Sequence, residues 1–271
     1  MTDADKPTDA ATPANRPRAG HGASPAAART ADPAAPADAT DPSGAADRAP
    51  PAPPARPADV LSVCEIFLSL QGEASRIGLP CTFVRLAGCN LRCQWCDTTY
   101  ARQAGQDMTV KNVMARLSRF NCRRVELTGG EPLCQPAALE LMRTLCDAGW
   151  EVLLETNGSR DIGPVDPRVG RIVDFKCPSS GMSQENLWSN VECLCARDEV
   201  KFILADRGDY NFAAAAVRGR GLLDRCPVIF SPVHGRLDPA DLAEWILADG
   251  LDVRLGLQLH KLLWPDEPRG R

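Results

Sequence analysis

The chain has 271 residues, a net charge of −4 and twelve cysteines. This charge gives no reason to expect binding to nucleic acid or to an anionic membrane surface. No apolar run is long enough to cross a bilayer, and no secretion signal is visible. We therefore expect a protein of the reducing cytoplasm, whose cysteines remain thiols instead of forming disulfides.

The N-terminal stretch differs in composition from the rest. Residues 1–57 are mostly Ala, Pro, Asp, Thr and Arg, without an aromatic residue. Such a segment buries too little apolar surface to offset the entropy of ordering its backbone. We predict a disordered tail over 1–57 in preference to a cleaved targeting peptide, because acidic residues are scattered through it. Residues 58–271 are long enough to form one domain with a full core.

From residue 60 onward, strand-like and helix-like patterns alternate. Strands are predicted from Val, Ile, Leu and Phe content, and helices from apolar residues three and four positions apart. In chain order the predicted elements are strands 60–70 and 81–86, helix 109–120, strand 125–128, helix 137–148, strands 150–156 and 171–176, helix 184–194, strand 199–204, helix 211–218, strand 228–230, helix 239–248 and strand 253–259. Thr109 is expected to cap the first helix.

This alternation determines the expected fold class. Strands that alternate with helices require crossover connections, which give a parallel sheet. The predicted helices are too few for an eightfold barrel. We therefore expect an α/β fold of the incomplete, open (β/α) barrel type. Ligands of such folds lie at the carboxyl ends of the strands, where the loops rich in Gly, Cys and charged residues fall.

Three cysteines, Cys89, Cys93 and Cys96, are spaced as C-x3-C-x2-C in the loop after the second strand. Thiolates select zinc, copper(I) or iron–sulfur clusters. A structural zinc would need a distant fourth ligand, whereas three thiolates on a [4Fe–4S] cluster leave one iron open. An open iron can bind the amine and carboxylate of S-adenosylmethionine. We favour this cluster over a zinc site or buried free thiols.

Loops after three further strands carry polar or glycine residues. In segment 128–132 (TGGEP) paired glycines allow close approach of backbone to a ligand, and Glu131 can accept a hydrogen bond from the methionyl ammonium. Segment 155–158 (ETNG) is as consistent with an ordinary turn as with a ligand site. Lys176 could meet a carboxylate or a ribose hydroxyl. Beside the cysteine loop, these segments favour a binding site.

Together these segments resemble the radical S-adenosylmethionine superfamily and, within it, the 7-carboxy-7-deazaguanine synthase family of queuosine biosynthesis. The similarity extends from about residue 62 to 264, with 58–271 as the catalytic domain. The segments that carry it are 69–73 (SLQGE), 85–89 (RLAGC), 96–98 (CDT), 128–132 (TGGEP), 155–158 (ETNG), 176–181 (KCPSSG) and 257–261 (LQLHK).

The resemblance implies a lyase reaction. An electron from flavodoxin or ferredoxin would reduce the cluster, and S-adenosylmethionine would be cleaved to a 5′-deoxyadenosyl radical. The radical would take hydrogen from C6 of 6-carboxy-5,6,7,8-tetrahydropterin, the ring would contract, and ammonia would leave to give 7-carboxy-7-deazaguanine. S-adenosylmethionine would be regenerated. The resemblance also implies a homodimer and a bound Mg²⁺.

The resemblance also assigns residues. Arg85 is chemically suited to clamp a carboxylate, and Thr98 stands at the Mg²⁺ ligand position. The residues expected to face the pterin are Leu70, Gln71, Gly72, Glu73, Arg85, Thr128 and His260. The residues expected to face S-adenosylmethionine are Trp95, Cys96, Asp97, Gly129, Gly130, Glu131, Lys176, Cys177, Pro178 and Ser179.

Two alternatives and one departure stay open at this point. A glycyl-radical activase shares the cysteine and GGE motifs but has no need for Gln71, Glu73 and Arg85. A non-catalytic iron–sulfur or zinc module has no need for the strand-end loops. In part of the family the C-terminus itself reaches the active site, but this chain continues through 264–271, so that role is not transferred.

Overall fold

The computed structural model describes residues 57–103, 105–267 and 269–270. The disordered tail predicted for 1–57 therefore lies outside the described residues, apart from residue 57. None of the helices in the described ranges combines the length and the apolar character that crossing a membrane requires.

A nine-stranded sheet with the order β3-β1-β2-β4-β5-β6-β7-β8-β9 forms the centre of the described domain. Strand β1 is antiparallel to β2 and β3, whereas β2 and β4 to β9 run parallel. The strands are β1 (Val60–Leu70), β2 (Pro80–Leu86), β3 (Gln106–Thr109), β4 (Arg124–Gly129), β5 (Glu151–Thr156), β6 (Gly170–Phe175), β7 (Glu199–Leu204), β8 (Val228–Pro232) and β9 (Arg254–Leu255). This arrangement confirms the expected open α/β architecture.

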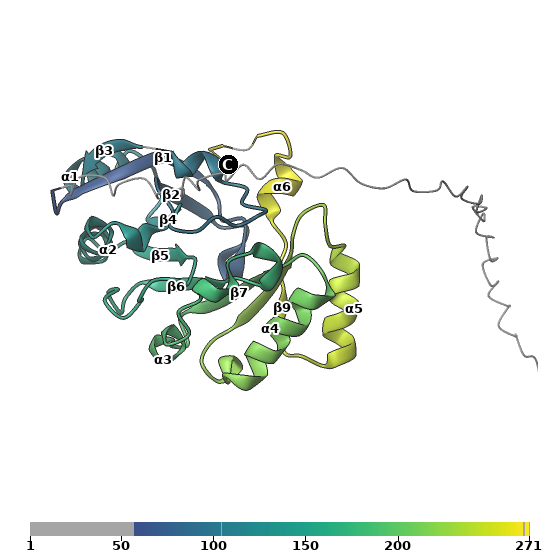
Figure 1. Ribbon diagram of the computed structural model, residues 1–271. Helices are drawn as coiled ribbons and strands as arrows, with labels where there is room; N and C mark the ends of the chain where they lie inside the picture. The colour runs from purple at the N-terminus through teal and green to yellow at the C-terminus, as the bar shows by residue number, and fades with distance from the viewer. Residues whose placement is uncertain (1–56, 104, 268, 271) are drawn as a thin grey trace, which may run out of the picture. The chain divides into compact units, whose positions relative to one another are not determined.

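Five helices cover one face of this curved sheet, and α6 lies apart from them (Figure 1). The five are α1 (Val110–Leu117), α2 (Ala137–Asp147), α3 (Asn190–Cys193), α4 (Arg207–Gly219) and α5 (Pro239–Asp249), and α6 spans Leu259–Leu263. Helix α6 begins where the Leu259 N–H donates to the Gly72 carbonyl, 2.9 Å away. The C-terminal segment is thereby joined to the loop that follows β1.

Side-chain alternation separates a helix-covered face of the sheet from a polar one. In β4, Val125 and Leu127 are fully buried in a core cluster with residues of α1 and α2, whereas Glu126 and Thr128 line a cavity. In β7, Val200 and Phe202 pack in a second cluster with α4 and α5. Each fully buried Val, Leu or Phe stabilises the fold by roughly 1.5–3 kcal/mol. The apolar face holds the sheet and leaves the other face available for chemistry.

The helix predicted over 184–194 is wrong for most of its length. Only the short 3₁₀ turn Ser183–Glu185 and α3 form there. The Asn186 side chain bonds both the N–H (2.8 Å) and the C=O (2.9 Å) of Lys176, and the Asn190 amide donates to the carbonyls of Gly158 and Arg160. Side-chain bonds to backbone compete with a helix, and here they fix the segment against neighbouring loops.

Three other features differ from the prediction: two element boundaries and one strand. Of the strand predicted over 253–259, only Arg254–Leu255 pairs with β8, and the chain then enters α6. Helix α4 begins at Arg207, four residues earlier than expected, because Asp206 caps it through the Asp209 N–H. Strand β3 was not predicted, since its sequence QDMT is mostly polar. The remaining predicted helices and strands are confirmed to within about two or three residues.

Candidate active site

A cavity of about 580 Å³ opens at the carboxyl ends of the parallel strands. Small-molecule sites typically have volumes of about 300–1,000 Å³. Most of the residues that the sequence predicts for ligand binding line it, although they come from segments far apart in the chain. These residues are Leu70, Gln71, Gly72, Glu73, Arg85, Cys89, Cys93, Trp95, Cys96, Asp97, Thr98, Thr128, Gly129, Gly130, Lys176 and His260.

The three cysteines are half-buried free thiols on this cavity. The Cys89 sulfur accepts hydrogen bonds from the Leu91 N–H (3.4 Å) and from the Asn157 amide (3.8 Å). Hydrogen bonds to a ligating sulfur tune the potential of a cluster. The loop itself is fixed by Arg92 and Arg102, which donate to the carbonyls of Cys89 and Cys93.

The glycine pair in TGGEP lies against the backbone that leads into the cysteine loop. The Gly130 N–H donates to the Leu86 carbonyl (2.9 Å), and the Glu131 N–H donates to the Gly88 carbonyl (2.8 Å). A Cβ on Gly130 would overlap the Gly88 carbonyl oxygen. Gly129 has φ +127°, which residues with a side chain rarely adopt. Both glycines are therefore required by close approach of two loops, in addition to any contact with a ligand.

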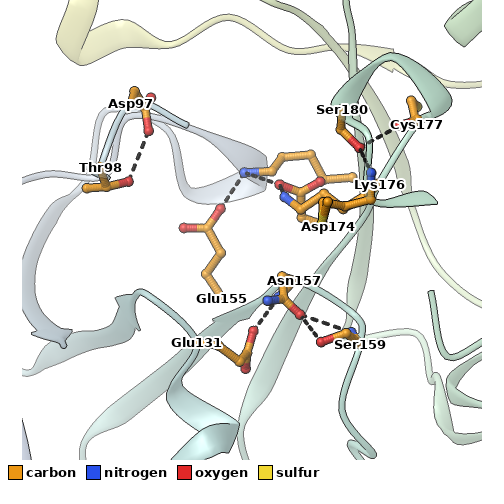
Figure 2. Close-up of polar contacts among 12 residues, drawn as sticks. Asp97, Thr98, Glu131, Glu155, Asn157, Ser159, Asp174, Lys176, Cys177 and Ser180 are labelled. Atoms are coloured by element: carbon orange, nitrogen blue, oxygen red, sulfur yellow. Dashed lines mark hydrogen bonds and ion pairs between the residues drawn. The ribbon is translucent and has the colours of Figure 1, made fainter. Parts of the chain in front are cut away.

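Glu131 does not line the cavity, contrary to the expected direct contact with a ligand ammonium. It is fully buried. Its carboxylate accepts from the Leu133 N–H (3.0 Å), the Thr156 hydroxyl (2.8 Å) and the Asn157 N–H (2.7 Å). Figure 2 shows the bond from Asn157. Burial raises the pKa of Glu131, although these three bonds favour its charged form. Glu131 therefore lies behind the cavity wall, where it positions Asn157.

Cys177, Pro178 and Ser179, which are expected to face S-adenosylmethionine, also lie outside the cavity lining. Cys177 is buried in the core under α4, Pro178 starts a 3₁₀ turn, and the Ser179 N–H donates to Asp209, 3.0 Å away. The carbonyl of Ser180, the next residue along the chain, accepts a hydrogen bond from the Gln94 N–H at 3.1 Å. The segment thus supports the cysteine loop from outside the cavity.

A buried lysine, Lys201 on β7, lies on the cavity floor among three carboxylates. Its side chain is 2% exposed. The ammonium pairs with Glu73 (2.7 Å) and Glu155, and Asp174 lies 3.9 Å away. Asp174 also pairs with Lys176 at 2.8 Å. Burial alone would lower the pKa of Lys201, but the surrounding carboxylates outweigh it and hold that pKa well above its usual value.

The sequence analysis did not predict that Glu126, Asp174 and Lys201 line the cavity. Each is a charged residue in the middle of a short, otherwise largely apolar strand, and this pattern is the signal that could have found them. Glu126 accepts a hydrogen bond from the Gln71 amide. Burial, followed by repulsion from Glu155, raises the pKa of Glu126 well above its usual value.

Arg85 is held in a fixed orientation at the side of the cavity nearest β1. Its Nε donates to Glu65 (2.8 Å), which also accepts from the Tyr100 hydroxyl (2.8 Å). The guanidinium carbon lies 5.8 Å from the centre of the Phe67 ring and 5.9 Å from that of Tyr100, within the range of cation–π attraction. Such an arrangement presents a positive charge to an anionic ligand without mobility of the side chain.

The C-terminal segment supplies further polar groups. Gln258 donates to Glu73 (2.8 Å), and Lys261 pairs with Asp97 (2.9 Å). Figure 2 shows Thr98 directed at Asp97, and its hydroxyl donates to that carboxylate at 3.0 Å. A Cβ on Gly72 would lie 2.5 Å from the His260 ring. The absence of a side chain at Gly72 is therefore what allows His260 to reach the cavity.

Comparison with known proteins gives consistent results. Residues 84–179 match the model of the radical SAM superfamily. The 7-carboxy-7-deazaguanine synthase of Chlorobaculum tepidum is 47% identical over 213 residues, which cover 78% of this chain and 97% of that protein. The same-named protein of Koribacter versatilis is 44% identical over 78% of this chain and 100% of its own length. The crystal structure of QueE from Escherichia coli has the same fold, with a TM-score of 0.60, 23% identity, and coverage of 74% of this chain and 95% of that one.

The superfamily match implies a [4Fe–4S] cluster and S-adenosylmethionine, and the cavity fits both. The three thiols form a soft donor set around one space, although no three His, Cys, Asp or Glu side chains in the described ranges are gathered closely enough to hold a single metal ion. The Oδ1 atom of Asp174 is buried without a hydrogen-bond partner, and a bound ligand can satisfy such an atom. The chain belongs to the 7-carboxy-7-deazaguanine synthase family of radical S-adenosylmethionine enzymes.

Proposed function

We propose that this enzyme converts 6-carboxy-5,6,7,8-tetrahydropterin to 7-carboxy-7-deazaguanine with loss of ammonia, for the queuosine or a related 7-deazapurine pathway. The observation that carries the proposal is a single cavity with three cysteines on one side and Gln71, Glu73 and Arg85 on another. When bound, the reduced cluster and S-adenosylmethionine supply a 5′-deoxyadenosyl radical. A glycyl-radical activase is not favoured, because the relatives are synthases.

The residues of the chain orient the two ligands toward each other. Arg85, fixed by Glu65 and two aromatic rings, binds the pterin carboxylate. Glu73, held between Lys201 and Gln258, accepts hydrogen bonds from pterin N–H groups. Leu70, Gln71, Gly72, Thr128 and His260 complete the pterin side. Trp95, Asp97, Gly129, Gly130 and Lys176 form the S-adenosylmethionine side.

Thr98 and a magnesium ion belong to the same proposal. Thr98 lines the cavity just after the last cluster cysteine. A hydroxyl oxygen, with water and substrate oxygens, is a suitable ligand set for Mg²⁺. The ion would neutralise charge on the substrate while Thr98 fixes its position. Turnover is expected to fall after a chelator removes divalent ions and to return on addition of Mg²⁺. An unchanged turnover rate after chelation would exclude this part of the proposal.

The remaining partners follow from family resemblance alone. We propose flavodoxin or ferredoxin as electron donor and a homodimer as the working form. The twelve cysteines are all free thiols, which supports a reducing compartment such as the cytoplasm. Sedimentation of the anaerobic holoenzyme, with reduction by purified flavodoxin and by ferredoxin, tests the oligomeric state and the donor.

An anaerobic assay of the full chain tests the function. The cluster is reconstituted and reduced, and S-adenosylmethionine is added with and without the carboxy-tetrahydropterin. We expect one ammonia and one deazapurine for each pterin consumed. Formation of 5′-deoxyadenosine without any deazapurine would refute the substrate, and absence of both would refute the reaction class. Cys93→Ala is the matched control, since loss of one thiolate should abolish both products.

A further inference from the structure

We propose that Lys201 is a positioning residue of this enzyme, which fixes the carboxylates of Glu73 and Glu155 toward the substrate. This inference rests on the proposed function, because Glu73 is a proposed pterin ligand. Lys201 itself lies beneath these carboxylates on β7, in the middle of a strand with mostly apolar neighbours. No motif in the sequence pointed to it.

The geometry connects elements that are far apart in the chain. Glu73 lies in the loop after β1, Glu155 on β5 and Asp174 on β6, and all three carboxylates surround the single ammonium of Lys201. An ammonium has three donors, and two of them are used by Glu73 and Glu155. The second oxygen of Glu155 accepts from the Thr128 hydroxyl at 3.0 Å. Lys201 therefore determines where the carboxylates of Glu73 and Glu155 lie.

The charge balance of the cavity floor depends on the same ammonium. Burial alone would raise the pKa of Glu155, but Lys201 outweighs burial and lowers it. Without Lys201, Asp174 would keep its ion pair with Lys176, but Glu73 and Glu155 would lose the ammonium that pairs with both of them. Like charges held together in a buried site raise one another's pKa. Loss of the ammonium is therefore expected to raise the pKa of Glu155. A protonated Glu155 would no longer accept hydrogen bonds on both of its oxygens.

Other charged groups face these carboxylates and are included in the prediction. Glu126 and Arg85 influence Glu155 and Glu73 from the β4 and β2 sides, Lys176 from β6, and His260 from α6. All of these groups remain when Lys201 is replaced. A change in the pH dependence of kcat/KM in a Lys201 variant therefore reports the loss of this ammonium.

Arg171 provides a matched control for a buried cation. It forms an ion pair with Asp198 in which the two side chains are 8% and 0% exposed, and neither residue lines the cavity. Arg171→Lys retains the charge but loses the two-point contact of the guanidinium. We expect it to lower stability without changing KM for the pterin or the pH profile.

The experiment compares Lys201→Met, Lys201→Arg and Arg171→Lys as reconstituted holoenzymes. We expect Lys201→Met to bind S-adenosylmethionine within about threefold of wild type, since the cluster side is untouched. Its kcat/KM for the pterin should fall at least tenfold, about 1.4 kcal/mol, with a larger loss at pH 6 than at pH 8.5. Lys201→Arg should recover part of this loss, because it restores a cation.

A readout without substrate separates this inference from the proposed function. ¹³C NMR of glutamate carboxyl carbons should show one additional group that titrates in the neutral range in Lys201→Met, compared with wild type and with Arg171→Lys, in which only groups such as Glu126 already have a raised pKa. If Lys201→Met does not fold, the double variant Lys201→Met/Glu155→Gln, which removes one carboxylate with the cation, should restore folding. An unchanged pH profile and glutamate titration in Lys201→Met, or a double variant no better than the single one, would overturn the inference. If the wild-type enzyme itself forms no deazapurine, the proposed function is refuted instead.

Discussion

Gly130 shows how one residue position controls the site. Its backbone lies so close to the Gly88 carbonyl that a single Cβ would overlap it. The same strand-end turn donates the two backbone bonds that fix the start of the cysteine loop. The position is therefore constrained by packing between two loops, and a larger residue must displace the loop that carries Cys89.

We expect Gly130→Ala to bind substoichiometric iron after reconstitution and to unfold at lower denaturant concentration than wild type. The physical reason is the overlap with Gly88, which forces backbone movement and costs of the order of 1–3 kcal/mol. Iron content and urea unfolding measure both effects. Gly219→Ala is the control, because a Cβ there meets nothing within 4 Å, and full iron occupancy in both variants would contradict the explanation.

Site residues differed in how far the sequence could predict them. For Cys89, Cys93 and Cys96 the sequence predicts cluster ligands because ligand chemistry requires that residue type at close spacing, and all three line the cavity. Glu131 was expected to face a ligand, whereas its carboxylate bonds Thr156 and Asn157, from β5 and the loop after it, outside the cavity lining. Contacts between strands depend on register and burial, which the sequence of one loop does not contain.

At the scale of single elements, α1 illustrates a local signal that was sufficient. The Thr109 hydroxyl accepts from the Asn112 N–H at 3.2 Å, as its position before the apolar pattern predicted. The segment 184–194 illustrates the opposite case, because Asn186 and Asn190 bond to distant backbone groups in place of a helix. Local propensity predicts an element when tertiary side-chain bonds do not compete with it.

Thr109→Ala should destabilise the protein by about 1 kcal/mol, the usual effect of losing an N-cap hydroxyl. Thr109→Ser keeps a hydroxyl and should lie much closer to wild type. Urea unfolding of the three proteins measures the difference. Equal stability of the Ala and Ser variants would show that the cap contributes nothing to α1.

The ion pair between Arg171 and Asp198 connects the start of β6 to the start of β7. Burial raises the pKa of Asp198, but hydrogen bonds from Arg171 outweigh it and hold that pKa below its ordinary value of 3.8. A carboxylate with a depressed pKa stabilises the fold above its unfolded pKa, and this contribution disappears as the pH falls through the folded pKa.

Arg171→Leu should therefore destabilise the protein by about 3–5 kcal/mol near pH 7, because it leaves a buried carboxylate unpaired. The difference in unfolding free energy between wild type and variant should shrink below about pH 3.8, where Asp198 becomes protonated in the unfolded chain. Denaturant unfolding at a series of pH values measures it. A difference that stays constant down to the acid limit of folding would contradict the assigned role of Asp198.

At the scale of the whole described domain, the open sheet explains how two ligands can share one cavity. The alternation of strands with helices along the chain was sufficient to predict the architecture, and the structure of QueE from Escherichia coli has the same fold. The contacts between the loop after β1, β7 and the C-terminal segment were not predictable, because they join Ser75, Glu199 and Arg254 across more than a hundred residues. These contacts join the loop after β1 to the start of β7 and to β9.

The most direct test of this arrangement follows one hydrogen atom. Carboxy-tetrahydropterin deuterated at C6 is given to the reduced holoenzyme with unlabelled S-adenosylmethionine. The S-adenosylmethionine recovered after turnover is then examined by mass spectrometry. If the cavity holds both ligands as proposed, deuterium appears in the 5′-methylene of S-adenosylmethionine while deazapurine accumulates. Deazapurine formed with no deuterium in the adenosyl group would contradict direct hydrogen transfer between the two ligands in this cavity.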